Sequence, residues 1–137
     1  MIEGSEILRY IENANKWDHN INYKESPLFY EVTEDCGGMY TCEPYKTEII
    51  ECWKFLNLEV ATKSASKILS MFYNYVRDGD FVGADMTRKY LQAGSSRRVI
   101  PKDCQDIFHE KYQKVINNLE YKKLKLIFLR EKENREG

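Results

Sequence analysis

The sequence contains no long apolar run, and its amino end has no basic segment. No stretch approaches the ~18 apolar residues that a membrane-spanning helix needs. Residues 1–6 read Met-Ile-Glu-Gly-Ser-Glu, without the cationic and apolar regions of a secretory signal. We therefore expect a cytoplasmic protein, in which the cysteines are thiols rather than disulfides.

Signatures of metal binding and catalysis are also scarce. Cys36 and Cys42 are separated by five residues, whereas zinc ligands usually pair about two to four residues apart. His19 and His109 are distant from any such pair. There is no Gly-x-Ser-x-Gly elbow and no Gly-rich phosphate loop ending in Lys-Ser/Thr. These absences predict a non-enzymatic protein without a metal or another cofactor.

Charge is unevenly distributed along the 137 residues, although the net charge is only −1. Residues 1–51 hold eleven acidic and four basic side chains, a balance of −7. Residues 52–137 hold eleven acidic and seventeen basic side chains, a balance of +6. This polarity either orients the molecule on a charged partner or reflects two differently charged solvated faces.

The amino-terminal half predicts one short helix and a small hairpin. Apolar spacing after Ser5 favours a capped helix over residues 5–14. The segments 28–32 and 39–42 flank the turn sequence Asp-Cys-Gly-Gly, which is typical of a β-hairpin. Because two strands alone are marginally stable, they must pack on helices.

The rest of the chain has helical periodicity. Pro44 is expected to open a helical turn, and residues 59–77 form the clearest amphipathic helix. Asp80 is expected to cap the next helix and Gly94 to end it in the left-handed conformation. A long last helix is expected from Pro101, with Asp103 as its cap. The predicted fold is therefore α+β and predominantly α, with a small β-hairpin packed on four to five helices and a long C-terminal helix.

The best candidate binding surface is the cationic segment from Met86 to Lys102, which contains five cations and no acid. Arg97 and Arg98 follow Gly-Ser-Ser in a predicted loop with no acid nearby, and such arginines commonly contact phosphates or carboxylates. A sequence pI of about 6.2 argues against a dedicated nucleic-acid binder. The candidate contact residues are Arg88, Lys89, Tyr90, Arg97, Arg98 and Lys102.

Some of these charges have simpler interpretations. Arg88 and Lys89 also complement the negative end of a helix, and Asp85 has the spacing of an intrahelical ion pair with either of them. The last helix carries apolar residues beyond its main stripe, which favours either a partner or homodimer contact or fuller burial within the monomer. These residues are Tyr121, Leu124, Ile127 and Phe128.

Two motifs resemble a known family. The sequence Glu-Pro-Tyr-Lys-Thr-Glu-Ile-Ile at 43–50, followed by Trp-Lys-Phe at 53–55, and the segment 79–92, which begins Gly-Asp-Phe-Val-Gly-Ala-Asp, are similar to the family catalogued as domain of unknown function 4385. The resemblance implies a small cytoplasmic protein of bacteria or phages, and it implies no catalytic residue. Family members continue after Gln92 with a longer segment rich in Arg, Tyr, Asn and His, which this chain lacks.

We therefore expect one domain over residues 1–137, comprising an N-terminal helix and loop (1–22), a family-like core (23–112) and a C-terminal helix extension (113–137). The predicted function is a binding module, a phage accessory protein whose cationic loop contacts a host or phage protein or ribonucleoprotein. One alternative is an inhibitor of a host defence nuclease complex, with the acidic N-terminal half imitating nucleic acid. Another is an enzyme for a phosphorylated small molecule, in which Arg97, Arg98, Asp85 and Glu43 converge.

Overall fold

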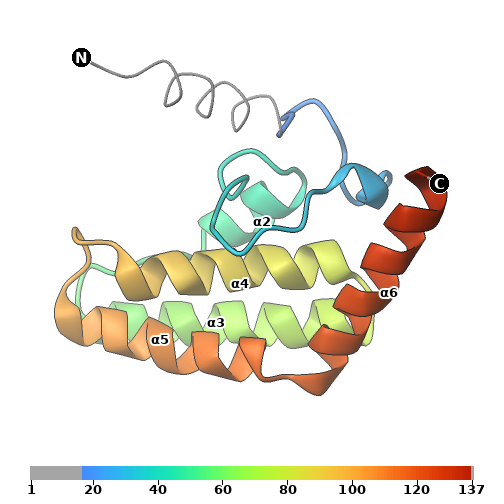
Figure 1. Ribbon diagram of the computed structural model, residues 1–137. Coiled ribbons are helices and arrows are strands. Elements are labelled where there is room, and N and C mark those ends of the chain that lie inside the picture. The colour runs from blue at the N-terminus through green and yellow to red at the C-terminus, as the bar shows by residue number, and fades with distance from the viewer. Residues whose placement is uncertain (1–16, 137) are drawn as a thin grey trace, which may run out of the picture.

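The computed structural model describes residues 17–136, and regular structure within them is entirely helical (Figure 1). The helix predicted over residues 5–14 lies outside the described residues. None of the described helices is long and apolar enough to cross a membrane. The helices are the 3₁₀ turn η1 (Pro27–Phe29), α2 (Tyr45–Ile50), α3 (Leu58–Arg77), α4 (Phe81–Ser96), α5 (Lys102–Ile116) and α6 (Leu119–Glu136).

Helix α4 lies at the centre of the fold. It packs against α3 and α5, which run antiparallel to it (Figure 1). Helix α2 and the irregular segment before it (residues 30–44) cover α4 from another side, and α6 crosses near the amino end of α4 (Figure 1). Every residue from Phe81 to Leu91 is buried as a result. A helix enclosed in this way must bury its charged residues together with its apolar ones.

The prediction for α3 is confirmed. Its buried face includes Ala61, Ala65, Ile68 and Phe72, which follow the spacing of one helical face. Asn57 caps the helix, because its side-chain oxygen accepts a hydrogen bond from the Val60 N–H at 2.9 Å. The small alanines let α3 approach its neighbours closely.

The turn from α3 to α4 confirms Asp80 as a cap but changes the role of the glycines. Asp80 accepts a hydrogen bond from the Gly83 N–H at 3.0 Å, while Gly79, with φ of 72°, supplies the left-handed residue. The prediction that Gly94 ends the helix left-handed is wrong, because α4 continues to Ser96. A Cβ on Gly94 would lie 2.4 Å from Cγ of Phe108, so this glycine allows α4 and α5 to touch.

The predicted β-hairpin is also wrong. Pro27–Phe29 form a 3₁₀ turn, and the described residues contain no strand, only one isolated bridge between Asn22 and Glu43. The two segments that were expected to be strands instead contribute the buried side chains of Tyr30 and Met39 to the core. Carbonyls of this segment accept hydrogen bonds from side chains of α4 instead of from a second strand. Side chains therefore satisfy the backbone of this irregular segment, and no sheet is needed.

The predicted single helix after Pro101 is two helices. Helix α5 ends at Ile116, where Asn117 donates from its side chain to the Gln113 carbonyl at 2.9 Å. The Asn118 side chain then accepts from the Tyr121 N–H at 2.9 Å and starts α6. Asp103 lies in the first turn of α5 rather than at its cap. The two asparagines let α6 leave the direction of α5 and rise along one end of the molecule (Figure 1).

Candidate functional site

Three charged residues of α4 lie in the protein interior. Asp85, Arg88 and Lys89 are 1%, 4% and 0% exposed, respectively. Isolated charges at such depth would cost several kcal/mol each, so they require partners. The contacts of these three residues form a buried charge centre that connects α4 to the irregular segment and to α6.

Asp85 is the acceptor of this centre. The Arg88 guanidinium donates to it from Nε at 3.0 Å and from Nη2 at 3.1 Å. The Tyr121 hydroxyl donates at 2.6 Å, and the Tyr30 hydroxyl donates to the second oxygen. Burial alone would raise the pKa of Asp85, but the charges of Arg88 and Lys89 and the donated hydrogen bonds outweigh it and lower that pKa. Asp85 is therefore ionised at neutral pH.

Arg88 uses its remaining donors to hold the irregular segment. Nη2 donates to the Thr33 carbonyl at 2.9 Å, and Nη1 donates to the Asp35 carbonyl at 2.7 Å and to the Gln92 side chain at 2.8 Å. The Glu34 carbonyl accepts more weakly, at 3.4 Å. A planar guanidinium with five donors suits this task better than an ammonium group. Arg88 thus fixes three successive backbone carbonyls against α4.

Lys89 points to the same segment a little further along the chain. Its ammonium donates to the Gly37 carbonyl and lies 4.3 Å from the Trp17 ring centroid and 4.6 Å from that of Tyr30. Burial lowers the pKa of Lys89 to about 8, against the attraction of Asp85. The neighbouring Tyr90 donates its hydroxyl to the Met39 carbonyl.

These contacts correct the predicted cationic surface. Arg88, Lys89 and Tyr90 are buried and bonded to the chain itself, so an external partner cannot reach them. The prediction of an ion pair between Asp85 and Arg88 is confirmed. The burial of this ion pair could not be predicted from the sequence, because a solvated helix can carry the same pattern of charged residues.

Arg97 and Arg98 lie instead in an accessible loop between α4 and α5. Arg97 is partly exposed, and its guanidinium carbon lies 5.4 Å from the Tyr40 ring centroid and 5.9 Å from that of Trp53. Nη2 of Arg97 also lies 3.4 Å from Sδ of Met39. Arg98 is exposed and has no hydrogen bond or ion pair with any described residue. The aromatic support from Tyr40 and Trp53 was missed in the sequence, where the two residues are far from the loop.

Lys102, the last predicted cation, begins α5 next to this loop. Its ammonium pairs with the Asp106 carboxylate on the exposed surface. Exposed pairs of this kind contribute little to stability and leave the cation accessible. Of the six predicted contact residues, Arg97, Arg98 and Lys102 therefore remain accessible. They belong to the connection between α4 and α5 and to the first residue of α5, and we call this group the cationic loop.

The four residues of the enzyme alternative do not come together. Asp85 is buried and its oxygens are occupied, while Arg97 follows it by twelve residues at the end of α4, about 18 Å away at about 1.5 Å per residue. Glu43 accepts hydrogen bonds from the Thr47 N–H at 2.8 Å and hydroxyl at 2.7 Å. Its slight burial would raise its pKa, but these bonds lower it. The structure thus offers no common pocket for these groups.

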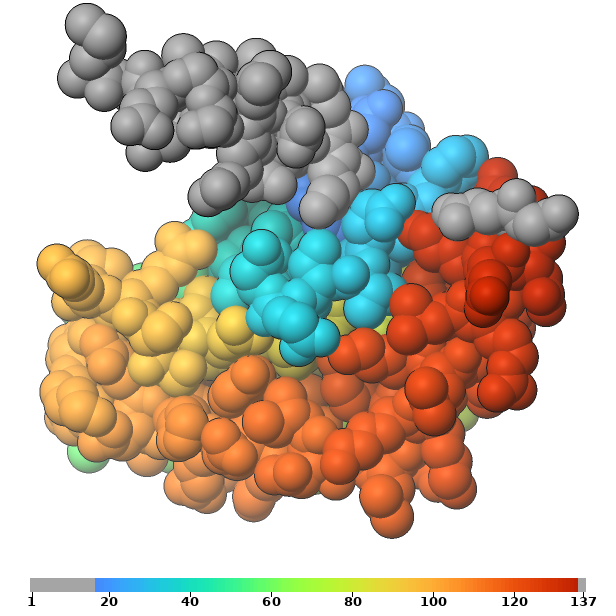
Figure 2. Space-filling view, in the orientation of Figure 1, coloured from blue at the N-terminus to red at the C-terminus, as the bar shows by residue number. Residues whose placement is uncertain are grey.

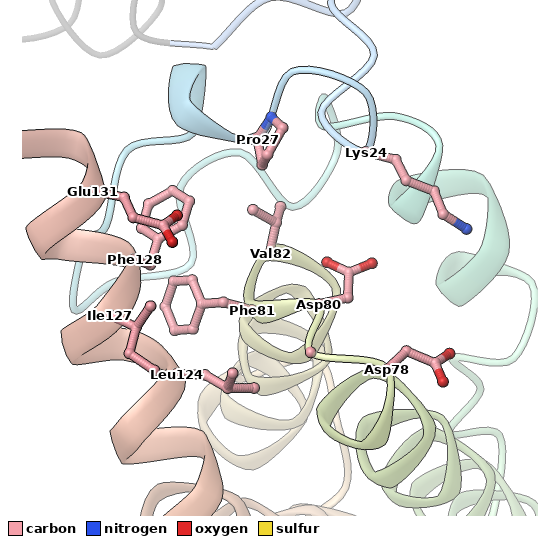
Figure 3. Close-up of a pocket in the computed structure, with 11 residues that line it drawn as sticks. Lys24, Pro27, Asp78, Asp80, Phe81, Val82, Leu124, Ile127, Phe128 and Glu131 are labelled. Carbon is pink, nitrogen blue, oxygen red and sulfur yellow. The ribbon is translucent and has the colours of Figure 1, made fainter. Parts of the chain in front are cut away.

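The predicted partner face of α6 is divided between the interior and the surface. Tyr121 and Phe128 are buried, Leu124 is partly buried and Ile127 is 51% exposed. Phe128 packs against Phe81 with ring centroids 5.0 Å apart. Helix α6 and the start of α4 form a groove of about 330 Å³. Figure 3 shows the residues that line it. Leu124, Ile127 and Phe128 line one wall of it, and Asp78, Asp80 and Glu131 add acidic groups.

Other chemistry is sparse in residues 17–136. No group of three or more His, Cys, Asp or Glu side chains there is placed to hold a metal ion. All four cysteines are free thiols, and burial raises the pKa of Cys42 to about 12. Over residues 17–136 the regular structure is helical, and it is built around a buried helix whose charges hold an irregular covering segment.

A comparison with known families places the chain in one of them. A family model described as domain of unknown function (DUF4385) matches residues 13–102, so the chain belongs to that family. No curated protein and no solved structure matches the chain. The matched residues include α4, its buried charges and the cationic loop, whereas Tyr121 and the rest of α6 lie beyond them.

Replacing Asp85 with Asn should destabilise the protein strongly. The change removes the countercharge of Arg88 and Lys89 but leaves both cations buried, which costs about 3–5 kcal/mol. Replacing Tyr121 with Phe removes one hydrogen bond to the same carboxylate and should cost about 1–2 kcal/mol. Urea denaturation measures both. As a control, Asp106→Asn breaks an exposed pair and should cost less than about 1 kcal/mol; an Asp85→Asn cost no larger than this would contradict the assignment.

The stability of the protein should also depend on Lys89 at alkaline pH. Its pKa is lower in the folded state, about 8, than in the unfolded chain, about 10.4. The unfolded chain therefore binds more protons between these values, so the contribution of Lys89 to stability rises with pH across this window, by about 1–3 kcal/mol. Cys42 and the buried tyrosines, whose pKa values are raised, act in the opposite direction as their unfolded counterparts ionise.

The measurement is therefore a difference between two proteins. The free energy of unfolding of the wild type minus that of Lys89→Met, which has a side chain of similar length without a charge, isolates the lysine. This difference should be constant below about pH 7 and should increase from about pH 8 to pH 10. A difference that is independent of pH would show that Lys89 titrates normally.

Proposed function

We propose that this protein is a non-enzymatic binding module that contacts an acidic surface of a protein or ribonucleoprotein through the cationic loop. The single observation that carries the proposal is the exposure of the two loop arginines and the aromatic contacts of one of them. Arg97 is held above the rings of Tyr40 and Trp53 while still partly exposed, and Arg98 is exposed without any described partner. An ordered arginine beside an unpaired one provides a preformed contact for carboxylates or phosphates.

The surroundings of the loop favour a macromolecular partner. Val99, next to Arg98, is 77% exposed, and Tyr40 is about half exposed. Arginine and tyrosine are enriched at the centres of protein interfaces, where aromatic area and a guanidinium fork act together. The loop also lies at one end of the helical layer, where a partner can approach without obstruction by α6 (Figure 1).

The proposal includes a cytoplasmic location, because the four cysteines, all free thiols in the structure, suit a reducing compartment. A phage accessory role would follow from the family resemblance and stays a prediction. The rival role as a nucleic-acid mimic rests on the acidic amino-terminal half. Some acidic groups of that half, such as Glu43, already accept hydrogen bonds within the chain, so we prefer the cationic loop.

Affinity capture with matched variants tests the proposal. The wild type, Arg97→Gln/Arg98→Glu and Arg77→Glu are each used to capture partners from a cell lysate, with and without nuclease treatment. Arg77 is an exposed cation at the carboxyl end of α3. A partner of the cationic loop should be lost with the loop variant, by about tenfold or more, and retained with Arg77→Glu.

The nuclease treatment separates the two partner classes. A protein partner that survives nuclease indicates direct protein contact, whereas loss on treatment indicates a ribonucleoprotein. If the loop variant retains every partner of the wild type, the proposed contact surface is wrong.

A further inference from the structure

We infer that α6 binds the α6 helix of a second copy of the chain in an antiparallel orientation, through residues that face away from the protein interior. Helix α6, coloured red-orange to red, forms one edge of the molecule in Figure 2. Tyr121 and Phe128 face the interior and are buried, whereas Leu119, Leu126 and Leu129 are 69%, 63% and 40% exposed. A row of exposed leucines along a helix is typical of a surface that contacts another helix.

The exposed leucines belong to a heptad pattern. Positions 119, 122, 126, 129 and 133 are separated alternately by three and four residues. This alternation describes the seam of a two-stranded coiled coil, along which the side chains of the two helices meet. The residues at these positions are all exposed, and we call them the α6 seam: Leu119, Lys122, Leu126, Leu129 and Glu133.

The two charged residues of the α6 seam determine the orientation. In a two-fold dimer, if Leu126 of one copy faces Leu129 of the other, then Leu129 also faces Leu126. Lys122 lies four residues before Leu126 and Glu133 lies four residues after Leu129, so the same antiparallel register brings Lys122 opposite Glu133 at both ends of the contact. A parallel pair would instead place Lys122 against Lys122 and Glu133 against Glu133. The seam is therefore complementary to itself only in the antiparallel orientation.

Both charged residues are available for such pairing. The side chains of Lys122 and Glu133 are exposed and make no hydrogen bond or ion pair with any described residue. Other lysines of α6 have partners in the chain itself, since Lys125 pairs with Glu34 and Lys132 pairs with Glu31. The charges of the seam can thus bind a second copy without breaking an internal contact among the described residues.

Two cations beside the α6 seam oppose the contact. Lys123 and Arg130 each follow a seam residue directly, so they approach one another across the two-fold axis. Lys123 is partly compensated, because it pairs with Glu120 at 3.3 Å. The helix has 18 residues and is about 27 Å long at about 1.5 Å per residue, so the interface is small and the dimer should be weak. Arg130→Gln should tighten it, because repulsion across the axis is removed.

The dimer would leave the cationic loop free. Helix α6 and the loop between α4 and α5 lie at opposite ends of the helical layer (Figure 1). A dimer through α6 therefore presents two cationic loops, which can bind a partner with repeated acidic sites more tightly than one loop can. The evidence for the seam comes from α6 alone, so this inference does not depend on the proposed function.

Sedimentation velocity of the full chain from about 1 µM to about 500 µM tests the inference. The wild type should change from monomer to dimer as the concentration rises. Lys122→Glu and Glu133→Lys each create two like-charge pairs in an antiparallel dimer and should weaken it about tenfold or more. The combined variant Lys122→Glu/Glu133→Lys restores opposite charges at both ends and should dimerise within about threefold of the wild type.

Urea denaturation of the same variants separates a contact from a folding defect. Lys122 lies in the first turn of α6 and Glu133 near its last turn, so neither charge reversal opposes the helix dipole. Both single variants should therefore unfold at the wild-type urea concentration while their dimers weaken.

Apolar variants locate the contact on the helix. Leu126→Gln/Leu129→Gln should leave the chain monomeric over the whole concentration range, because both central leucines of the seam are lost. Ile127→Gln, on the face that the sequence predicted for a partner, should dimerise as the wild type does. Arg97→Gln/Arg98→Glu should also dimerise normally, so a failure of the cationic loop is distinguishable from a failure of the seam.

Three results would overturn the inference. The first is a wild type that stays monomeric at every concentration, even if the leucine variant loses a captured partner, since the seam would then bind a different protein. The second is a dimer that neither single charge reversal weakens. The third is a dimer that Ile127→Gln weakens and Leu126→Gln/Leu129→Gln does not.

Discussion

The ion pair between Asp85 and Arg88 is the interaction on which the rest of this structure depends. It lies on a helix that is buried along most of its length, so it cannot be solvated and must be satisfied by other parts of the chain. Tyr121 reaches it from α6, and three successive carbonyls of the irregular segment reach it through Arg88. The pair therefore links α4 both to α6 and to the irregular segment.

A purely apolar core would hold these elements less specifically. Buried ion pairs often add little net stability compared with apolar residues of similar size, but a fixed set of donors and acceptors accepts only one arrangement. This explains how an irregular segment, without a sheet or helix to satisfy its carbonyls, can cover a buried helix. It also explains why Lys89 remains beside Trp17 and Tyr30 despite the cost of burying it. Tyr121, the residue through which α6 bonds to Asp85, lies outside the residues that the family model matches.

Local signals in the sequence predict the elements that depend on local physics. The periodicity of α3, the cap at Asp80 and the i, i+3 spacing of Asp85 and Arg88 are all confirmed. The predicted hairpin is wrong because apolar segments that flank a turn sequence also occur in an irregular segment, where the backbone carbonyls accept hydrogen bonds from side chains. The predicted surface role of Arg88 and Lys89 is wrong because burial of α4 depends on all its neighbours together. Support for Arg97 by Tyr40 and Trp53 is likewise a contact distant in sequence.

Amide hydrogen exchange tests this account most directly, because it measures how the irregular segment is held. The N–H groups of Met39 and Cys42 are bonded only within turns of that segment. If the buried charge centre fixes the segment to α4, these amides open only with the whole fold and exchange with nearly the same free energy as amides in the middle of α4. Exchange of Met39 and Cys42 by local opening, at a free energy several kcal/mol lower than that of α4, would contradict the account.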